Sequence, residues 1–242
     1  MKKTDLNASR TNKNNTLLMI TRTLLLFTSL IYCFTSCSEF SNTDRYQQSG
    51  SEGQAIDSDT TVLAKATFAG GCFWCTEAYF ERLKGVETVI SGYSGGKKGN
   101  PSYQEVSNGK SEHAEAVQVY YDSTQISYQE LLEVFFATHD PTTLNRQGPD
   151  YGKQYRSIVF YRTPHEKQLT EQYIKQLEDA GTYKNAIVTY VQPFKRFWPA
   201  EGYHQDYYKN NPDDPYVVSV ARPKVRKFED SYRDKLKPEY VR

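Results

Sequence analysis

The sequence predicts a single α+β domain over residues 61–222, built as a two-layer α/β sandwich with a mixed central sheet. Segments with strand-like alternation and segments with helical periodicity follow one another in this range, which is typical of a domain that mixes both element types around one core. Hydrophobic residues make up 38% of the chain, which is enough for a core of this size. No internal repeat divides the range into smaller units.

Strands are expected where apolar residues alternate with polar ones, or where short apolar runs are bounded by turn residues. In the first such segment, Ala64, Ala66 and Phe68 alternate with Lys65 and Thr67. The predicted strands cover 62–68, 86–93, 114–121, 156–161 and 186–191.

Helices are expected after clear start signals. Ser127 and Thr163 each precede a glutamate three residues later, which is the pattern of a capping box, and Pro164 takes the first helical position after Thr163. Gly181 is expected to end the second of these helices. The predicted helices cover 72–83 and 199–209 and begin after Ser127 and Thr163. Their inward faces are expected to carry Phe80 and Leu83, then Leu131, Leu132, Phe135 and Phe136, and then Leu169, Tyr173 and Leu177.

Residues 1–36 have the features of a signal peptide of the bacterial lipoprotein type. Basic residues precede the apolar run 24–32, which is shorter than the roughly 20 residues that span a bilayer. Phe34-Thr35-Ser36 then precedes Cys37 and resembles the lipobox in which the cysteine is acylated. A true start at Met19 would give a more typical signal. The alternative interpretation is an uncleaved membrane anchor.

The polar segment 37–60 holds few apolar residues and is predicted to be a flexible tether. At the other end, 223–242 is predicted to be a charged, exposed C-terminal tail. We therefore expect an exported, membrane-anchored lipoprotein of the bacterial cell envelope, facing the periplasm or the surface. The formal net charge of +1 does not indicate nucleic-acid binding.

Four cysteines occur in the chain; Cys33 lies in the signal segment, and Cys37 directly follows it. Cys72 and Cys75 remain for the domain. A structural zinc site would need more ligands nearby, and a structural disulfide between residues three apart would constrain little chain, so redox chemistry is favoured. Cys72 follows Gly70-Gly71 at a strand-to-helix turn, where free N–H groups and the helix dipole favour a thiolate. We expect no cofactor and no metal.

The motif around this pair separates two redox families. Thioredoxin-like oxidoreductases usually carry Trp before the first cysteine, whereas here Gly71 precedes Cys72. The run 70–75, Gly-Gly-Cys-Phe-Trp-Cys, instead resembles the A-type peptide methionine sulfoxide reductases. The resemblance continues in family order through the blocks 92–96, 100–103, 109–115, 121–122, 139–142, 146–157 and 200–207. It covers 66–212 and implies reduction of the S epimer of methionine sulfoxide, in proteins and as the free amino acid.

The resemblance also implies which residues act. Cys72 would be the nucleophile. Glu115 would be the acid that protonates the sulfoxide oxygen, since burial can keep a carboxyl group neutral at pH 7. The hydroxyl groups of Tyr103 and Tyr155 would hold that oxygen, and Asp150 would line the same polar site.

Phe73 and Trp74 would form the apolar pocket for the S-methyl group of the substrate, although such a pair is more often simple core packing. Cys75 stands where many relatives carry Gly, and no cysteine follows it in the chain. We therefore predict that Cys75 attacks the sulfenic acid of Cys72 to form a disulfide, which an external thioredoxin-like dithiol reduces.

Two other functional classes remain open: a general disulfide oxidoreductase that uses the same cysteine pair, and a non-catalytic surface lipoprotein. Outside the reacting groups, Glu201 and Tyr207 are expected to support the site. The histidines are expected to be structural hydrogen-bonding residues or exposed; they are His113, His139, His204 and, on the surface, His165.

Overall fold

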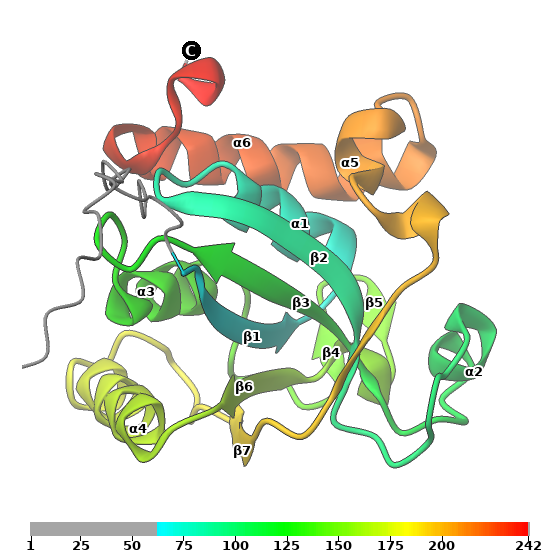
Figure 1. The fold of residues 1–242 in the computed structure, drawn as a ribbon, viewed down its shortest axis with the longest axis horizontal. Helices are drawn as coiled ribbons and strands as arrows, with labels where there is room; N and C mark the ends of the chain where they lie inside the picture. Colours follow the sequence, from blue (N-terminus) through cyan, green and yellow to red (C-terminus); the bar gives the residue numbers. More distant parts are fainter. Residues whose placement is uncertain (1–61, 242) are drawn as a thin grey trace, which may run out of the picture. The chain divides into compact units, whose positions relative to one another are not determined.

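A six-stranded mixed sheet runs through the computed structural model, which describes residues 62–241 (Figure 1). Its strand order is β7-β6-β1-β3-β2-β8, and neighbouring strands are antiparallel except for the parallel pair β6 and β7. The strands are β1 (Ala64–Gly70), β2 (Val86–Ser94), β3 (Ala114–Tyr121), β6 (Ser157–Tyr161), β7 (Tyr190–Pro193) and β8 (Phe197–Pro199). The predicted mixed sheet is confirmed.

The N-terminal predictions lie outside the described residues. This applies to the signal peptide over 1–36, the tether over 37–60 and the lipidation of Cys37. Within residues 62–241, no helix is long and apolar enough to cross a bilayer.

Helices cover one face of the sheet, as a two-layer sandwich requires. The helices are α1 (Phe73–Glu81), α2 (Tyr103–Ser107), α3 (Tyr128–Thr138), α4 (Pro164–Asp179), α5 (Tyr207–Asn210) and α6 (Arg222–Ser231). Because successive strand residues point to opposite faces, Phe68 of β1 joins the large core under the helices, whereas Ala69 joins a smaller cluster on the other face. Phe194 and Phe197 cover that smaller cluster from the chain that leads into β8. The two-layer prediction is confirmed.

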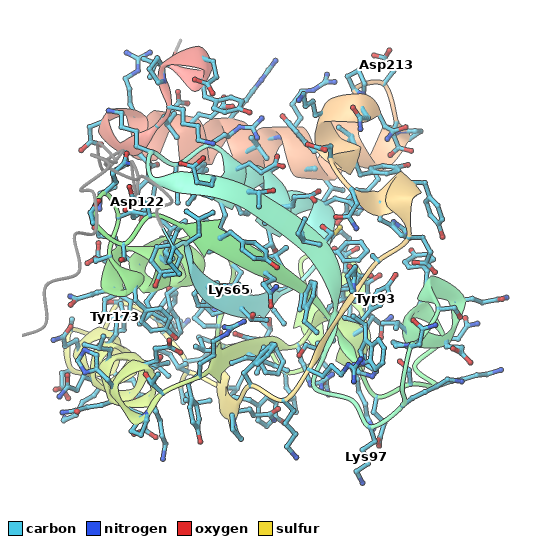
Figure 2. All side chains as sticks on the ribbon, in the orientation of Figure 1. Lys65, Tyr93, Lys97, Asp122, Tyr173 and Asp213 are labelled. Carbon is cyan, nitrogen blue, oxygen red and sulfur yellow. The ribbon has the colours of Figure 1, made fainter. Side chains whose placement is uncertain are left out.

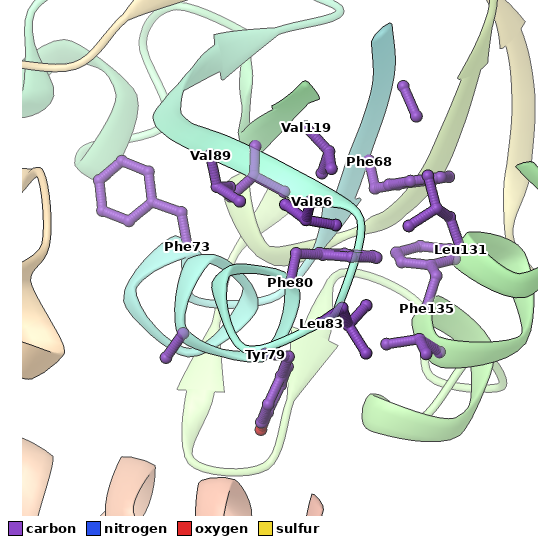
Figure 3. Packing of buried hydrophobic residues seen from close by; sticks show 14 of the residues in the cluster. Phe68, Phe73, Tyr79, Phe80, Leu83, Val86, Val89, Val119, Leu131 and Phe135 are labelled. Carbon is purple, nitrogen blue, oxygen red and sulfur yellow. The ribbon is translucent and has the colours of Figure 1, made fainter. Parts of the chain in front are cut away.

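Stacked aromatic rings join the sheet to α1 and α3 (Figure 3). The ring of Phe68 lies 5.3 Å from that of Phe80 and 5.0 Å from that of Phe135, and all three side chains are almost fully buried. Burial of one such side chain stabilises a fold by about 1.5–3 kcal/mol. Phe80 therefore lies on the inner face of α1, as predicted, while Tyr79 points the other way, towards Phe228 of α6. Leu83 is buried in the same core but lies beyond Glu81, where α1 ends earlier than the predicted helix over 72–83.

The two predicted capping boxes form to different extents. Ser127 Oγ accepts from the backbone N–H of Glu130, and the Glu130 carboxylate accepts from the N–H of Ser127, so the box before α3 is complete. Before α4, Thr163 Oγ1 accepts from the N–H of Glu166, but the Glu166 carboxylate accepts from the N–H of Arg162 instead. Either arrangement satisfies N–H groups that the first turn leaves free.

Two predicted elements are wrong in their extent. The strand expected over 186–191 begins only at Tyr190, because the N–H of Val188 donates to the carbonyl of Pro141 and not to a neighbouring strand. The helix expected over 199–209 is replaced by the end of β8, a single 3₁₀ turn at Gly202–His204 and the short α5. Asp206 has a φ of +53°, a left-handed conformation that a continuous helix does not contain.

The prediction that 223–242 is an exposed tail is also wrong. Most of α6 lies in this segment, and its Val225 and Phe228 are buried in the large core, as is Leu236 beyond the helix. Arg82, the C-cap residue of α1, and Glu229 of α6 form a buried ion pair at 2.9 Å. The high charge of the segment concealed apolar residues at helical spacing, which dock α6 against α1.

Candidate active site

The turn from β1 into α1 places Cys72 at a helix end. Gly71 has a φ of +98°, and a Cβ atom there would lie 2.7 Å from Cγ of Gln147, so glycine fits both the conformation and the space. Cys72 is then the N-cap of α1, and its carbonyl accepts from the N–H groups of Cys75 and Thr76.

A pocket of about 220 Å³ opens at this helix end. It is lined by Cys72, Phe73, Trp74, Tyr103, Glu115, Asp150, Tyr155, Asp214 and Tyr216. The structure therefore brings together every residue to which the sequence assigned chemistry or substrate contact, except Cys75. Cys75 lies on the first turn of α1, outside the pocket lining and buried.

Glu115 is a buried carboxyl group at the base of the pocket. It projects from β3 on the same face as Val117 and Val119 and is 2% exposed. Its Oε2 accepts a hydrogen bond of 3.1 Å from the backbone N–H of Phe73. Burial, and then the proximity of Cys72, raise the pKa of Glu115 well above its ordinary value, and the Phe73 N–H opposes this only in part. Both causes favour the protonated form of the carboxyl group.

Two tyrosine hydroxyl groups share the pocket with this carboxyl group. Burial, and then the proximity of Glu115, raise the pKa of Tyr103 to about 12 and that of Tyr155 further, so both hydroxyl groups remain hydrogen-bond donors. Glu201 binds the backbone of Tyr103 and the side chain of Tyr93. Its Oε1 accepts from the N–H of Tyr103 at 2.9 Å, and its Oε2 accepts from the hydroxyl of Tyr93, labelled in Figure 2, at 2.8 Å.

The apolar wall of the pocket consists of Phe73 and Trp74. Phe73 is 1% exposed and packs 5.1 Å from the ring of His204. The Trp74 ring stacks on Tyr207 at 3.6 Å, and its Nε1 donates to Nδ1 of His204 at 3.1 Å. Tyr207 and His204 thus hold the indole in place.

The two cysteines have pKa shifts of opposite sign. Burial raises the pKa of the Cys72 thiol well above its ordinary value, while contact with the Tyr216 hydroxyl and the N–H of Trp74 lowers it in part. Hydrogen bonding with Cys72 lowers the pKa of Cys75, and the charge of Lys224 lowers it further. The expectation that the helix end holds Cys72 as a thiolate stays a prediction, because burial opposes the ionised form of Cys72 whereas the Tyr216 hydroxyl and the N–H of Trp74 favour it.

Sequence reasoning missed Asp214 and Tyr216. The Tyr216 hydroxyl donates to Oδ2 of Asp150 at 2.7 Å and lies beside Cys72. Asp214 Oδ1 accepts from the N–H of Tyr216, and its Oδ2 accepts from the Tyr207 hydroxyl. No local signal marks either residue, because the chain holds 20 Tyr and this segment has no chemical motif.

The histidines have the structural roles that the sequence predicted. His113 accepts from the N–H of Gly96 and contacts the carbonyl of Lys98, whereas His139 bonds to the carbonyl of Phe135 and to Ser157. Among residues 62–241, no group of three or more metal-binding side chains converges.

A model of the family described as peptide methionine sulfoxide reductase matches residues 64–236 of the chain. The chain belongs to this family. The match extends through α6, so the segment predicted as a tail is part of the peptide methionine sulfoxide reductase domain.

Relatives and solved structures agree with the family assignment. The chain is 55% identical over 171 residues to peptide methionine sulfoxide reductase MsrA of Haloquadratum walsbyi, and this alignment covers 71% of this chain and 97% of that relative. It is 48% identical over 196 residues to MsrA of Deinococcus radiodurans, and this alignment covers 81% of this chain and 94% of that relative. The reduced form of Mxr1 from Saccharomyces cerevisiae has a similar fold, with a TM-score of 0.58, 34% identity and coverage of 66% and 92%. Methionine sulfoxide reductase A of Corynebacterium diphtheriae has a TM-score of 0.57, 33% identity and coverage of 64% and 77%.

Proposed function

We propose that this protein reduces the S epimer of methionine sulfoxide to methionine, in oxidised proteins and peptides and as the free amino acid. The observation that carries the proposal is the pocket that is lined by both Cys72 and the buried carboxyl group of Glu115, whose pKa is raised by burial. Family membership supports the same reaction.

The first step uses both of these groups. The Cys72 sulfur, after loss of its proton, attacks the sulfoxide sulfur, and Glu115 gives its proton to the sulfoxide oxygen. The oxygen leaves as hydroxyl and ends on Cys72, so that methionine is released and Cys72 becomes a sulfenic acid. Tyr103 and Tyr155 donate hydrogen bonds to the oxygen as its charge develops.

The arrangement of acid, apolar wall and nucleophile would select one hand of the sulfoxide, and the family resemblance implies that it is the S epimer. The oxygen faces Glu115, the methyl group contacts Phe73 and Trp74, and the sulfur faces Cys72. A sulfoxide of the opposite hand would exchange its oxygen with a carbon substituent, which would bring an apolar group to the buried carboxyl.

In the second step Cys75 attacks the sulfenic sulfur, water leaves, and a Cys72–Cys75 disulfide forms. A thioredoxin-like dithiol then reduces the disulfide. Among residues 62–241, Cys72 and Cys75 are both in the thiol form in the structure, with their backbones linked through the first turn of α1.

An epimer assay tests the reaction. The full chain is incubated with dithiothreitol and with each epimer of dabsyl methionine sulfoxide, and methionine product is measured. We expect product from the S epimer alone. Equal action on both epimers, or on neither, would contradict the proposal, and reduction of insulin without sulfoxide specificity would indicate the general disulfide oxidoreductase.

Two variants separate the roles of the cysteines. Cys72→Ser should have no activity, because the nucleophile is lost. Cys75→Ser should form one equivalent of methionine in a single turnover but lose turnover with thioredoxin, because the sulfenic acid cannot be resolved. Unimpaired multiple turnover of Cys75→Ser with thioredoxin would show that another thiol resolves the intermediate.

We further propose that the protein is an exported lipoprotein, anchored through acylated Cys37 and translated from Met19. The apolar run before Cys37 and the polar segment after it support this. Labelling with a fatty-acid analogue should mark the wild-type protein and not Cys37→Ser. Equal labelling of both would exclude the anchor, and N-terminal sequencing of the precursor would locate its start.

A further inference from the structure

A second cleft, of about 570 Å³, lies at the end of β2 and shares none of the residues that line the substrate pocket. The end of β2 and the following loop 95–99 form one side of it, and segment 192–198, which runs from β7 into β8, forms the other. The rings of Phe160 and Trp198 give it apolar surface. A volume of this size is typical of a cleft that binds a ligand.

The lining of this cleft is strongly cationic. Among residues 62–241, it contains no carboxylate and four exposed cations, which are Lys97, labelled in Figure 2, Lys98, Lys195 and Arg196. Glu105 forms a salt bridge with Lys98, but within the same residues no salt bridge neutralises the other three cations. The cationic cleft therefore offers three positive charges to an anionic ligand.

Hydrogen bonds to the sheet hold both sides of the cationic cleft in place. On one side, Nδ1 of His113 accepts from the N–H of Gly96 at 3.2 Å, so its Nε2 donates to the carbonyl of Lys98 at 2.8 Å. On the other side, Oγ of Ser94 donates to the carbonyl of Arg196 at 2.8 Å. The backbone that carries the cations is thus fixed before a ligand binds.

Two connections place the cationic cleft beside the substrate pocket. His113 of the cleft comes two residues before Glu115 of the pocket, which is about 7 Å along an extended strand. Loop 95–99 of the cleft leads into α2, whose first residue, Tyr103, lines the pocket. Since an extended chain advances about 3.3 Å per residue, a peptide with its methionine sulfoxide in the pocket needs only a few more residues to reach the cleft.

A fifth cation, Arg156, lies between the two sites. It follows Tyr155 of the pocket, in the segment that links β5 (Asp150–Tyr151) to β6. Its guanidinium would lie 3.2 Å from a Cβ atom on Gly95 of the cleft, and it donates to the carbonyls of Lys153 and Glu112. Positive charge therefore continues from the cationic cleft towards the substrate pocket.

We propose that the cationic cleft binds an acidic segment of the oxidised substrate protein, a few residues along the chain from the methionine sulfoxide in the pocket. Aspartate and glutamate carboxylates of that segment pair with Lys97, Lys195 and Arg196. The inference rests on the proposed function, because it names the substrates that the same site would repair fastest, which are proteins with an oxidised methionine close to acidic residues.

The position of the cleft favours a substrate segment over other anionic ligands. The chain's own segment 37–60 holds five acidic residues and one basic residue. However, the described structure begins beside Ala64, which pairs with Tyr121 at the far end of β3, about 27 Å along that strand from His113. A lipid surface is flat, whereas this site is a hollow that borders the substrate pocket. A substrate segment is already next to the cleft when its sulfoxide is bound.

The test compares three peptides of equal length, each with one central methionine S-sulfoxide. The acidic peptide carries three glutamates on either side, beginning three residues from the sulfoxide; the neutral peptide carries glutamines and the basic peptide lysines at those places. The kcat/KM of the full chain is measured for each peptide with dithiothreitol as the reductant, so that docking of a protein reductant does not contribute. The result is the ratio of the acidic to the neutral value, in which any general loss of activity cancels.

For the unaltered chain we expect a ratio of about five at low salt, a basic peptide slower than the neutral one, and a ratio near one at about 0.5 M salt, where exposed charges are screened. Lys97→Gln/Lys195→Gln should lower the ratio at low salt to about two or less. Lys65→Gln/Lys184→Gln is the matched control, since it removes two exposed lysines that lie outside the cleft, and it should keep a ratio of about five.

A ratio near one in the unaltered chain, or an equal fall of the ratio in the control variant, would overturn the inference. Binding is also measured without catalysis, by the fluorescence anisotropy of a labelled glutamate peptide that contains no sulfoxide. We expect this peptide to bind the unaltered chain and to bind Lys97→Gln/Lys195→Gln several-fold more weakly, and equal binding by both would overturn the inference.

Two further outcomes would assign the cationic cleft to another ligand and overturn the inference. One is peptide binding that appears only after the five acidic residues of segment 37–60 are changed to amides. The other is lysine-dependent binding to phosphatidylglycerol vesicles with no binding of the peptide. If the unaltered chain forms no methionine from any peptide, the proposed function fails, and the anisotropy measurement still decides whether the cleft binds an acidic segment.

Discussion

Two buried glutamates, Glu115 on β3 and Glu77 on α1, show what turns a protonated carboxyl group into a catalyst. Their exposed fractions are 2% and 1%. Burial is the main cause that raises the pKa of both, and it takes that of Glu77 to about 8. In burial and in the direction of their pKa shifts the two residues are alike.

They differ in what lies next to them. Cys72 is the second cause of the pKa shift at Glu115, and Glu115 lines the substrate pocket. At Glu77 the second cause of the pKa shift is Glu81. Among the described residues, Oε2 of Glu77 is buried without a hydrogen-bond partner. Burial favours the protonated form of either carboxyl group, but only a carboxyl group that lines the substrate pocket beside the nucleophilic sulfur can give its proton to a substrate.

The largest expected effect tests this difference directly. Glu115→Gln should lower kcat/KM for methionine S-sulfoxide by about 10²–10⁴, because the amide cannot supply the proton. Glu77→Gln, the matched change outside the pocket, should change kcat/KM by less than about twofold. Steady-state kinetics on both variants measures the contrast, and a comparable loss in the two would mean that the catalytic acid is not at Glu115.

A smaller effect is expected from the hydroxyl groups that accompany Glu115 in the pocket. Tyr155→Phe and Tyr103→Phe should each lower kcat by about tenfold, since each removes one donor while the other remains. Tyr128→Phe is the control, because Tyr128 is also buried but its hydroxyl contacts Thr170, away from the pocket. Loss of kcat in the control equal to that in the pocket variants would indicate packing damage and not loss of a hydrogen bond.

The smallest effect concerns stability and should appear at Glu77. The pKa of Glu77 is raised from 4.5 to about 8, so its contribution to stability is complete below pH 4.5 and is lost as pH rises towards 8. Glu77→Gln removes this titration, and its Tm should exceed that of the unaltered protein by a few degrees at pH 8 and by little near pH 4.5. A Tm difference that is constant with pH, in thermal unfolding followed by circular dichroism, would contradict this.

Local patterns predicted the part of the fold that carries the nucleophile and the acid. The strand over 114–121 and its inward face, with Glu115 between apolar neighbours, follow from alternation alone. The helix after Gly71 follows from the glycine pair and from Phe80 and Leu83 at helical spacing. In both places the residues that determine the structure lie close together in the sequence.

The C-terminal part could not be predicted in this way. The many charged residues of α6 hid the pattern of its buried face, which contains Val225 and Phe228. The left-handed conformation of Asp206 interrupts the segment that was predicted to be one helix over 199–209. Tyr216 lines the substrate pocket, although no sequence motif marks it as a site residue. The places of Tyr216 and Phe228 depend on ring contacts with Trp74 and Tyr79 of α1, which are distant from them in the sequence.

By itself, the sequence determined the family motifs, the turn that places Cys72 at the start of a helix, and the presence of a second thiol one turn later. Local sterics and hydrophobic periodicity act over a few residues, so neighbouring residues suffice to encode them. The tertiary structure decided the surroundings of the nucleophile and of the acid. Burial raises the pKa of Cys72, and burial and then the proximity of Cys72 raise the pKa of Glu115. These are effects of desolvation and of charge at a distance, which exist only after separate parts of the chain have packed together.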